Sequence, residues 1–316
     1  MKRRELGKSG LEVAPLAFGG NVFGWTVDQP TAFQLLDAFT AAGFNLIDTA
    51  DTYSRWIPGN KGGESETIIG NWLKRSGKRQ QVVIATKVGM EMGPDKKGLS
   101  KAYILSEVED SLRRLQTDSI DLYQAHKDDP NTPLEETLEA FALLVGQGKV
   151  KAIGGSNYSA KRLLESLDTS RQHSYPRYES LQPNYNLYDR SEYESELEAV
   201  CVEQGLGVIP YFSLASGFLT GKYRSEEDLS KSSRGSRVKK YLDDRGFRIL
   251  KALDEVAAKY HATPAQTALA WLMARPSITA PIASATSLAQ LNELIGAAQL
   301  TLDKESIEVL NQASAW

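Results

Sequence analysis

Four ionisable side chains of different types stand near the ends of three apolar runs. Asp48, Lys87 and His126 end or directly follow three successive runs, and Tyr53 lies five residues after the first of them. A lysine cation beside a phenol lowers the phenol's pKa from about 10, and a nearby carboxylate keeps the lysine charged. A neutral imidazole can orient a carbonyl oxygen. Together these groups predict protonation of a carbonyl oxygen while another group delivers a nucleophile.

Each of these residues also has an ordinary structural interpretation. Asp48 is typical of a loop or helix cap, Tyr53 of packing, and Lys87 of a solvated strand end. His126 suits a hydrogen-bonded structural histidine, because histidine has only an intermediate preference for burial. The structural interpretation is the commoner one for each residue alone. Their joint occurrence at three successive strand ends favours catalysis.

Short β-branched runs alternate with amphipathic stretches along the chain. The predicted strands cover residues 14–18, 45–48, 82–87, 120–125, 152–155, 180–182, 208–211 and 278–282. The predicted helices cover residues 31–42, 64–74, 105–115, 134–145, 160–167, 192–203, 247–259, 264–274 and 289–297. Strict alternation of strand and helix predicts parallel strands, because parallel neighbours need a long crossover between them.

Eight strands favour one α/β architecture over its alternative. They fit a closed (β/α)8 TIM barrel, in which function lies at the C-terminal ends of the strands. The alternative is an open doubly wound sheet, whose GxGxxG signature is missing after the first strand. Gly19, Gly20 and Gly24 have the wrong spacing for it.

A barrel of this kind usually needs about 250 residues, so the remainder of this chain forms additions. Residues 2–12 predict an N-terminal β-hairpin, residues 212–245 a long polar loop after the seventh strand, and residues 300–316 a C-terminal extension. All three belong to a single predicted barrel domain over residues 1–316.

Composition excludes several classes of function. The chain has 37 Lys and Arg against 40 Asp and Glu, a net charge of −3, which excludes a dominant attraction to nucleic acid or acidic membranes. No apolar stretch approaches the roughly 18 residues of a membrane span. Cys201 is the single cysteine and the three histidines show no paired ligand spacing, so no disulfide or metal is expected. We expect a soluble, cytoplasmic protein that acts on a small molecule.

Six ordered motifs run along the chain together with these positions. They comprise residues 43–50 with Tyr53, 86–87, 121–126, 148–157, 182–186 and 219–223. In order and spacing they resemble the aldo-keto reductases, most closely the bacterial subgroup near potassium-channel β-subunits and aldehyde or sugar reductases. The resemblance implies a nicotinamide-dependent carbonyl reductase in which the four ionisable residues form a catalytic tetrad. Tyr53 is then the proton donor, and the reduced nicotinamide is the hydride source.

The same resemblance implies which residues hold the cofactor. Ser156, Asn157 and Gln182 are expected to hold the carboxamide, and Tyr211 is expected to stack on the nicotinamide ring. Loop polarity and packing at the barrel rim are their ordinary interpretations. The other candidates come from the loops after the first, second, seventh and eighth strands. They are Gly20, Asn21, Asp48, Phe212, Ser213, Leu214, Gly217, Leu219, Gly221, Lys222, Arg237, Ser284, Thr286, Gln290 and Glu293.

The resemblance favours NADP(H) as the cofactor, with NAD(H) as the alternative. Relatives that bind the 2′-phosphate of NADP(H) carry a Lys or Arg after the eighth strand. This chain has Ser284 and Thr286 there and no Lys or Arg. The basic insert from Lys222 to Arg248, which includes Arg237, is therefore predicted to recognise the phosphate. The same run also suits an ordinary solvated loop.

The substrate pocket is predicted to have an apolar mouth, since pockets combine aromatic walls with a few polar groups. Its candidate residues are Trp25, Trp56, Met90 and Tyr185, all of which also suit core packing. The loop at residues 54–63 and the C-terminus ending in Trp316 are expected to shape it. Three functions stay open. The first is reduction of aldehydes, ketones or aldoses, and the second is oxidation of alcohols or sugars. The third is nicotinamide sensing by a regulatory subunit with slow turnover. The sequence leaves the substrate and the oligomeric state undetermined.

Overall fold

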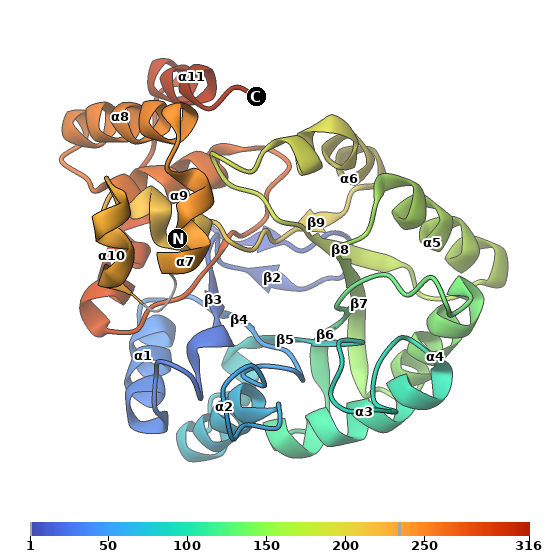
Figure 1. The fold of residues 1–316 in the computed structure, drawn as a ribbon. Coiled ribbons are helices and arrows are strands. Elements are labelled where there is room, and N and C mark those ends of the chain that lie inside the picture. The colour runs from blue at the N-terminus through green and yellow to red at the C-terminus, as the bar shows by residue number, and fades with distance from the viewer. Residues whose placement is uncertain (1, 233–234) are drawn as a thin grey trace.

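The computed structural model describes residues 2–232 and 235–316, and within them eight parallel strands form one curled sheet. The strands are β3 (Ala17–Gly19), β4 (Leu46–Asp48), β5 (Val83–Val88), β6 (Ile120–Ala125), β7 (Val150–Ser156), β8 (Tyr178–Gln182), β9 (Gly207–Val208) and β10 (Ile282–Ala283). Their order is β10-β3-β4-β5-β6-β7-β8-β9. A parallel bridge between Val208 and Ile278, and a hydrogen bond from Ile282 N to Pro210 O at 2.9 Å, join the two edges into a barrel (Figure 1).

Helices follow the strands and surround the barrel in Figure 1. They are α1 (Gln29–Ala41), α2 (Glu64–Ser76), α3 (Lys101–Leu115), α4 (Leu134–Gly146), α5 (Ala160–His173), α6 (Glu198–Gln204), α8 (Asp244–Lys259), α9 (Pro264–Ala274) and α10 (Leu288–Ala297). The start of α9 shows how the sequence sets a boundary. Thr263 and Gln266 cap each other's backbone N–H groups, and Pro264 occupies the first turn, where no intrahelical donor is needed. The predicted (β/α)8 barrel is confirmed.

Two apolar cores lie on the two faces of the sheet. Leu46 and Ala85 belong to the inner core, whereas their neighbours Ile47 and Ile84 belong to the outer core beneath the helices. Successive side chains of a strand point to opposite faces. The residues two positions beyond Leu46 and Ala85 therefore point inward as well, which brings polar groups from the ends of β4 and β5 together.

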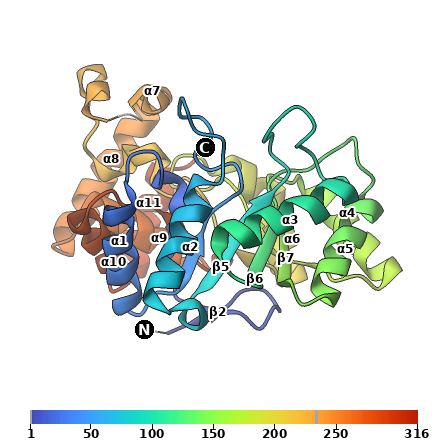
Figure 2. The same ribbon diagram turned by 90° about the horizontal axis from the view of Figure 1, so that it is seen from below.

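The predicted N-terminal hairpin is confirmed. It pairs β1 (Arg4–Glu5) antiparallel with β2 (Glu12–Val13) and lies at one end of the barrel, with long loops and α7 (Gly235–Val238) toward the other end (Figure 2). The Arg4 guanidinium donates to three backbone carbonyls between residues 273 and 279, which ties the hairpin to the barrel. The opposite end of the barrel carries the C-terminal ends of the strands, where barrels of this kind have their functional residues.

The long loop after the seventh barrel strand, β9, contains several short helices. They are η4 (Ala215–Thr220), η5 (Glu226–Lys231), α7 and η6 (Lys239–Tyr241). The loop is less polar than its composition indicates, because Phe218, Tyr223, Val238 and Tyr241 are fully buried. It therefore has an apolar base of its own, which fixes its position beside the strand ends.

Some element boundaries differ from prediction. The first barrel strand starts three residues late, because the Ala14 N–H donates to the Asn45 side chain at 2.9 Å and Pro15 has no N–H. β9 and β10 are only two residues long. The segment predicted as one helix over 192–203 opens with a π-helical turn at Tyr193–Leu197 before α6.

The C-terminal extension forms α11 (Lys304–Ala313), which packs against α8 outside the barrel (Figure 1). The guanidinium groups of Arg245 and Arg248 donate to backbone carbonyls of residues 313–315. Trp316 is 61% exposed and does not line the cavity described below. These bonds hold the end of the chain against α8, contrary to the prediction that it shapes the substrate pocket.

Candidate active site

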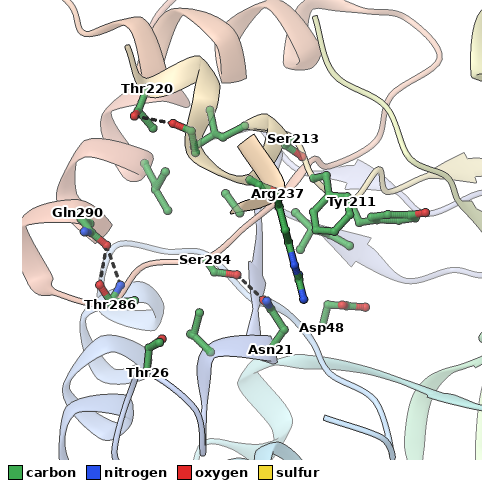
Figure 3. A pocket seen from close by; sticks show the side chains of 18 of the residues that line it. Asn21, Thr26, Asp48, Tyr211, Ser213, Thr220, Arg237, Ser284, Thr286 and Gln290 are labelled. Carbon is green, nitrogen blue, oxygen red and sulfur yellow. Dashed lines mark hydrogen bonds between the residues drawn. The ribbon is translucent and has the colours of Figure 1, made fainter. Parts of the chain in front are cut away.

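A cavity of about 760 Å³ lies where the barrel strands end (Figure 3). Most of the predicted cofactor residues line it together, although they come from the C-terminal ends of six different strands and the loops that follow them. They are Asn21, Asp48, Ser156, Asn157, Gln182, Tyr211, Phe212, Ser213, Leu214, Gly217, Lys222, Arg237, Ser284, Thr286, Gln290 and Glu293. Of the predicted tetrad, Asp48, Tyr53 and His126 also line the wall, and Lys87 lies behind it.

Lys87 is fully buried near the end of β5 and is hydrogen-bonded to two other members of the tetrad. Its ammonium donates to Asp48 Oδ2 at 2.8 Å, to the Thr49 carbonyl at 2.7 Å and to Tyr53 Oη at 3.2 Å. An ammonium has three N–H donors, so all of them are used. Because the Tyr53 oxygen accepts from Lys87, the phenol's own proton is available to a ligand in the cavity.

Burial and charge set the protonation states of this pair. Burial by itself lowers the pKa of Lys87, but Asp48 and Tyr53 outweigh it, so the pKa is raised and the ammonium stays charged. Burial raises the pKa of Tyr53 above 10.0 and outweighs the lowering by Lys87. The predicted net lowering is therefore wrong, because desolvation of the phenolate is the larger cause. The phenol keeps its proton at neutral pH.

His126 follows β6, and its ring lies 6.0 Å from the Tyr53 ring. Burial, together with the charges of Lys87 and Lys127, lowers the pKa of His126 well below 6.5, so the imidazole is neutral. Its Nδ1 is buried without a hydrogen-bond partner among the described residues. A neutral imidazole has one N–H donor, which can orient a ligand oxygen beside the phenol.

Asn157 connects the predicted nicotinamide platform to the tetrad. Its Oδ1 accepts from the Tyr211 hydroxyl at 2.7 Å, and its Nδ2 donates to the His126 carbonyl at 2.9 Å and to Ser156 Oγ at 3.1 Å. The residue has a left-handed backbone, with φ of 56°. Asparagine tolerates this conformation better than most residues. The Tyr211 ring is therefore fixed relative to His126.

Gln182 makes a second connection to the tetrad. Its Nε2 donates to Asp48 Oδ1 at 2.9 Å, and its backbone carbonyl accepts from Ser156 Oγ at 2.8 Å. Asp48 is thus hydrogen-bonded by Gln182 on one oxygen and by Lys87 on the other. Two of the residues predicted to hold the carboxamide, Asn157 and Gln182, are thus hydrogen-bonded to His126 and Asp48 of the predicted tetrad.

Cations enter the cavity from the loop after β9. Lys222, Lys231 and Arg237 line the wall, and Figure 3 shows the Arg237 side chain reaching into the cavity. Lys231 is paired with Asp228 at 2.7 Å. Within the described part of the chain, no carboxylate pairs with Lys222 or Arg237. Their charge is therefore available to an anionic ligand.

The loop after β10 contributes hydroxyl and amide groups. Thr286 donates from its N–H and its hydroxyl to Gln290 Oε1, at 2.8 and 3.0 Å, and Ser284 Oγ donates to Asn21 Oδ1 at 2.7 Å (Figure 3). Glu293 adds a carboxylate to the same wall. Among the described residues, the Lys and Arg side chains of the wall therefore all come from the loop after β9.

Three predicted cofactor residues support the wall from behind. A Cβ on Gly20 would lie 2.9 Å from Ser65 Oγ and 3.0 Å from the Asp48 carbonyl, so only glycine fits. Gly221 ends η4 in a left-handed conformation with φ of 79°. Leu219 is fully buried in the apolar base of its loop. None of the three lines the cavity.

The structure brings together two of the four predicted substrate residues. Trp25 and Trp56 line the cavity, with their rings edge to face at 5.8 Å. Met90 lies outside the wall. Tyr185 is fully buried, and its hydroxyl donates to Glu194 at 2.6 Å, so its ring is part of the core and not of the mouth.

Other residues that line the cavity were not singled out from the sequence. They include Val22, Thr26, Ala265 and Leu294. Ser216 and Thr220 also line the cavity and lie in the loop after the seventh strand that the sequence indicated, where Ala215, Ser216 and Gly217 all have positive φ. Ala265 lies in the first turn of α9 and reaches the wall only through tertiary packing.

The described residues contain no group of three or more His, Cys, Asp or Glu arranged to hold a metal ion. No helix in residues 2–232 or 235–316 is both long and apolar enough to cross a membrane. Cys201 is buried, and burial raises its pKa to about 12, so its thiol is protonated.

The barrel and the groups at its strand ends are those of an NAD(P)H-dependent oxidoreductase. The aldo/keto reductase family model matches residues 15–315, and the chain belongs to this family. The chain is 36% identical to "Uncharacterized oxidoreductase YrpG" of Bacillus subtilis (strain 168), over 98% of this chain and 95% of that protein. It is 33% identical to "Aldo-keto reductase YhdN" of the same organism, over 98% and 93%. It is also 32% identical to "Probable voltage-gated potassium channel subunit beta" of Arabidopsis thaliana, over 93% and 90%.

Proposed function

We propose that the protein catalyses the NADP(H)-dependent reduction of aldehydes and ketones to alcohols, with Tyr53 as the proton donor. The hydrogen bonding of Lys87 carries this proposal. Its three donors are committed to Asp48, the Thr49 carbonyl and Tyr53, which leaves the phenol proton for a ligand. Burial raises the pKa of Tyr53, so the phenol is protonated at neutral pH and can act as the proton donor.

The cavity residues fit a nicotinamide dinucleotide. The volume of about 760 Å³ suits a ligand of that size. Lys222 and Arg237 offer positive charge to phosphates, and Gly217, with φ of 100°, allows close backbone approach. Asn157 and Gln182 have amide oxygens beside the tetrad for the carboxamide. When bound there, the reduced cofactor supplies the hydride.

Each residue of the tetrad has a separate role in the proton transfer. Neutral His126 donates a hydrogen bond to the substrate oxygen and orients it toward Tyr53. The Tyr53 phenol transfers its proton to that oxygen as negative charge develops on it. Lys87 then stabilises the phenolate, and Asp48 keeps Lys87 charged and in place.

The preference for NADP(H) over NAD(H) follows from the cations of the insert. The additional phosphate of NADP(H) brings about two negative charges. Lys222, Lys231 and Arg237 line the same cavity and attract such a group. Glu293 opposes it, because a phosphate placed against its carboxylate would be repelled. NAD(H) is therefore the alternative outcome of the cofactor test.

The same groups support the oxidative direction, because a Tyr53 phenolate beside Lys87 can accept the proton that the phenol donates in reduction. One relative is named as a potassium channel subunit, which is the kind of protein that the third function, nicotinamide sensing by a regulatory subunit, describes. The assembled tetrad favours turnover. A panel of carbonyls and alcohols with both cofactors distinguishes these functions.

Replacing Tyr53 with phenylalanine tests the mechanism. Tyr53→Phe removes only the phenolic oxygen, so we expect carbonyl reduction to fall by about 10²–10⁴-fold or more. The affinity for NADPH, measured by fluorescence quenching, is expected to stay within about twofold, because the phenylalanine ring keeps the shape of the cavity wall. Tyr103→Phe is the matched control, since its buried hydroxyl has no partner among the described residues.

Two outcomes would contradict this proposal. Unchanged turnover in Tyr53→Phe would remove the assigned proton donor. Equal affinity for NADPH and NADH in the same titration would remove the cofactor preference, while leaving the tetrad chemistry in place.

A further inference from the structure

The loop at residues 54–63 is closed by a single carboxylate. Glu64, in the first turn of α2, accepts from the Ser54 N–H at the start of the loop, at 3.3 Å. It also accepts from the Lys61 N–H at 2.8 Å and from the Gly62 N–H at 3.0 Å, near the end of the loop. Such hydrogen bonds to a carboxylate are stronger than those between neutral groups. Glu64 therefore holds both ends of the loop together.

Uncharged hydrogen bonds tie the same loop to the segment before α1. Ser54 is fully buried, and its hydroxyl donates to the Phe23 carbonyl at 2.8 Å. Asn60 Nδ2 donates to the Gly24 carbonyl at 3.0 Å and to the Ser54 carbonyl at 3.1 Å. The N–H, the carbonyl and the hydroxyl of Ser54 are thus all hydrogen-bonded, which fixes the residue directly after the proposed proton donor.

Tyr53 is attached to the same elements. Its carbonyl accepts from the Ser65 N–H, in the first turn of α2, at 3.3 Å. Its ring meets the Trp56 ring of the loop edge to face, with the centroids 5.8 Å apart. Trp56 is itself 43% exposed, so the loop contacts the phenol ring on one side and solvent on the other. The charged side chains of the loop, Arg55 and Lys61, are exposed.

The phenol of Tyr53 is more sensitive to water than to its charged neighbours. Lys87 donates to its oxygen at 3.2 Å, Asp48 pairs with that ammonium, and the neutral His126 ring lies 6.0 Å away. Asp51 acts from the loop after β4. Burial is the largest cause of the raised pKa of Tyr53 and exceeds the effect of each of these charges. Water at the phenol would weaken this cause, because burial raises the pKa by removing hydration from the phenolate.

We propose that Glu64 is a positioning residue for the reaction, which closes the loop at residues 54–63 over Tyr53 and limits the access of water to the phenol. This inference rests on the proposed function and adds a residue that acts through the proton donor. Glu64 does not line the cavity, so its effect must pass through the loop. Exclusion of water keeps the phenol protonated at alkaline pH, where reduction would otherwise lose its proton donor.

Glu64→Gln and Asn60→Ala test this inference. Glutamine keeps the length of Glu64 but has only one acceptor oxygen, and the alanine removes both hydrogen bonds of Asn60 without changing any charge. The readout is the alkaline limb of kcat/KM for carbonyl reduction with NADPH, which reports the pKa of the essential acid. We expect the limb to move down by about one pH unit in Glu64→Gln, a fraction of the roughly 3–5 units that complete burial can cause. Asn60→Ala should move it in the same direction.

Glu305→Gln and Asn71→Ala are the matched controls. Glu305 also lies in the first turn of a helix, α11, and Asn71 lies in α2, where it is hydrogen-bonded to Gln29 and Gln116. Neither lines the cavity, so both variants should keep the wild-type limb. The pH at which the limb falls does not depend on the fraction of active molecules, so a general loss of activity cannot imitate the shift.

A limb that stays at the wild-type pH while the rate falls would overturn the inference, because the loop would then hold Tyr53 without excluding water. A limb lowered in Glu64→Gln alone would assign the effect to the lost charge and would overturn it as well. Absence of turnover with every carbonyl would instead overturn the proposed function.

Ultraviolet titration of tyrosinate then tests the loop without turnover. The signal of Tyr53 is the difference between each protein and its Tyr53→Phe version. Ionisation of Tyr53 at lower pH in Glu64→Gln and Asn60→Ala than in the wild type supports the inference, and an unchanged titration removes it.

Discussion

The two faces of strand β5 carry two buried ionic clusters of different character. Lys87 points into the barrel and pairs with Asp48, one cation to one anion, and Tyr53 connects this inner cluster to the cavity. Thr86, the preceding residue, points outward and donates to the Glu66 carboxylate at 2.6 Å. A single step along the strand therefore separates a cluster open to ligands from one sealed beneath α2 and α3.

The outer cluster contains three carboxylates and one guanidinium. Arg114 donates to Glu66 at 2.6 Å and to Glu107 at 2.5 Å. Burial, together with Glu66 and Glu107, raises the pKa of Asp51 well above 3.8. Asp51 Oδ2 has no hydrogen-bond partner among the described residues. The raised pKa of Asp51 favours a proton on the outer cluster, whereas the raised pKa of Lys87 keeps a positive charge in the inner cluster.

Burial is common to both clusters, so burial alone does not mark a catalytic site. The inner cluster has balanced charge and presents a phenol proton to the cavity. The outer cluster joins two helices whose backbones approach so closely that a Cβ on Gly70 would lie 2.1 Å from the Arg114 carbonyl. Removing the cation from the inner cluster should therefore change the rate, and removing it from the outer cluster should change stability.

Lys87→Met is expected to have the largest effect. Without the ammonium, the phenolate formed in the reaction loses its stabilising charge, so kcat/KM should fall by about 10²–10⁴-fold. Steady-state kinetics with a fixed aldehyde measure this loss. Lys151→Met is the control, because Lys151 pairs with Asp121 on a neighbouring strand but has a half-exposed side chain away from the cavity.

If Lys87→Met retained most of the rate, the inner cluster would be structural like the outer one. If Lys151→Met lost rate to the same extent, the effect would belong to lysines of the barrel in general. Either result would remove the distinction between the two faces of β5.

Arg114→Met is the corresponding change in the outer cluster. It leaves Glu66 and Glu107 buried without their cation, and uncompensated buried charge costs about 3–5 kcal/mol of the free energy of unfolding. Urea denaturation measures this loss. The rate per folded molecule is expected to stay near that of the wild type, because Arg114 does not line the cavity.

The neighbouring Arg113 provides the matched control for Arg114. Its side chain is 72% exposed and, within the described part of the chain, pairs only with Asp110, so Arg113→Met should cost less than about 1 kcal/mol. Equal stability losses in the two variants, or a rate loss in folded Arg114→Met comparable to that of Lys87→Met, would contradict the separation of roles.

The sequence predicted the inner cluster but not the outer one. Asp48, Lys87 and His126 end successive strands, so topology alone brings them together. Asp51, Glu66 and Glu107 lie on loops and helices, where a single carboxylate normally faces solvent, and nothing local shows that their helix faces pack inward. The sign of the Tyr53 pKa shift was missed for the same reason, since it depends on desolvation and not on residue types.

The fold was predicted best where local signals are strong. β6 at Ile120–Ala125 and α9 at Pro264–Ala274 have the predicted bounds, since one is an uninterrupted barrel strand and the other has a proline-led cap. β9 and β10 were predicted too long, because the strand ladder there is interrupted and only tertiary pairing sets its length. Tyr185 looked like a pocket residue, but its bond to Glu194 places it in the core.

Asp51→Asn replaces a carboxyl group of raised pKa with a neutral amide, so its effect on stability is expected to be smallest near pH 5 and to grow as pH rises. Between pH 3.8 and the raised pKa of Asp51, the folded protein holds a proton that the unfolded chain has released, so wild-type stability falls as pH rises. The slope reaches about 1.4 kcal/mol per pH unit for one such group. Asparagine cannot ionise, so the variant should gain stability relative to the wild type as pH rises from 5 to 8, measured by urea denaturation.

Asp129→Asn supplies a control of opposite sign. Burial raises the pKa of Asp129, but hydrogen bonds from the Leu99 and Asn131 N–H groups and from Thr132 outweigh it, so the pKa is lowered. This carboxylate stabilises the fold above its unfolded pKa, and the benefit is lost as pH falls through the folded pKa. Asp129→Asn should therefore be less stable than the wild type at neutral pH and approach it in acid. Parallel stability curves for Asp51→Asn and the wild type would mean that the outer cluster carries no proton, and that charge balance does not distinguish it from the inner pair.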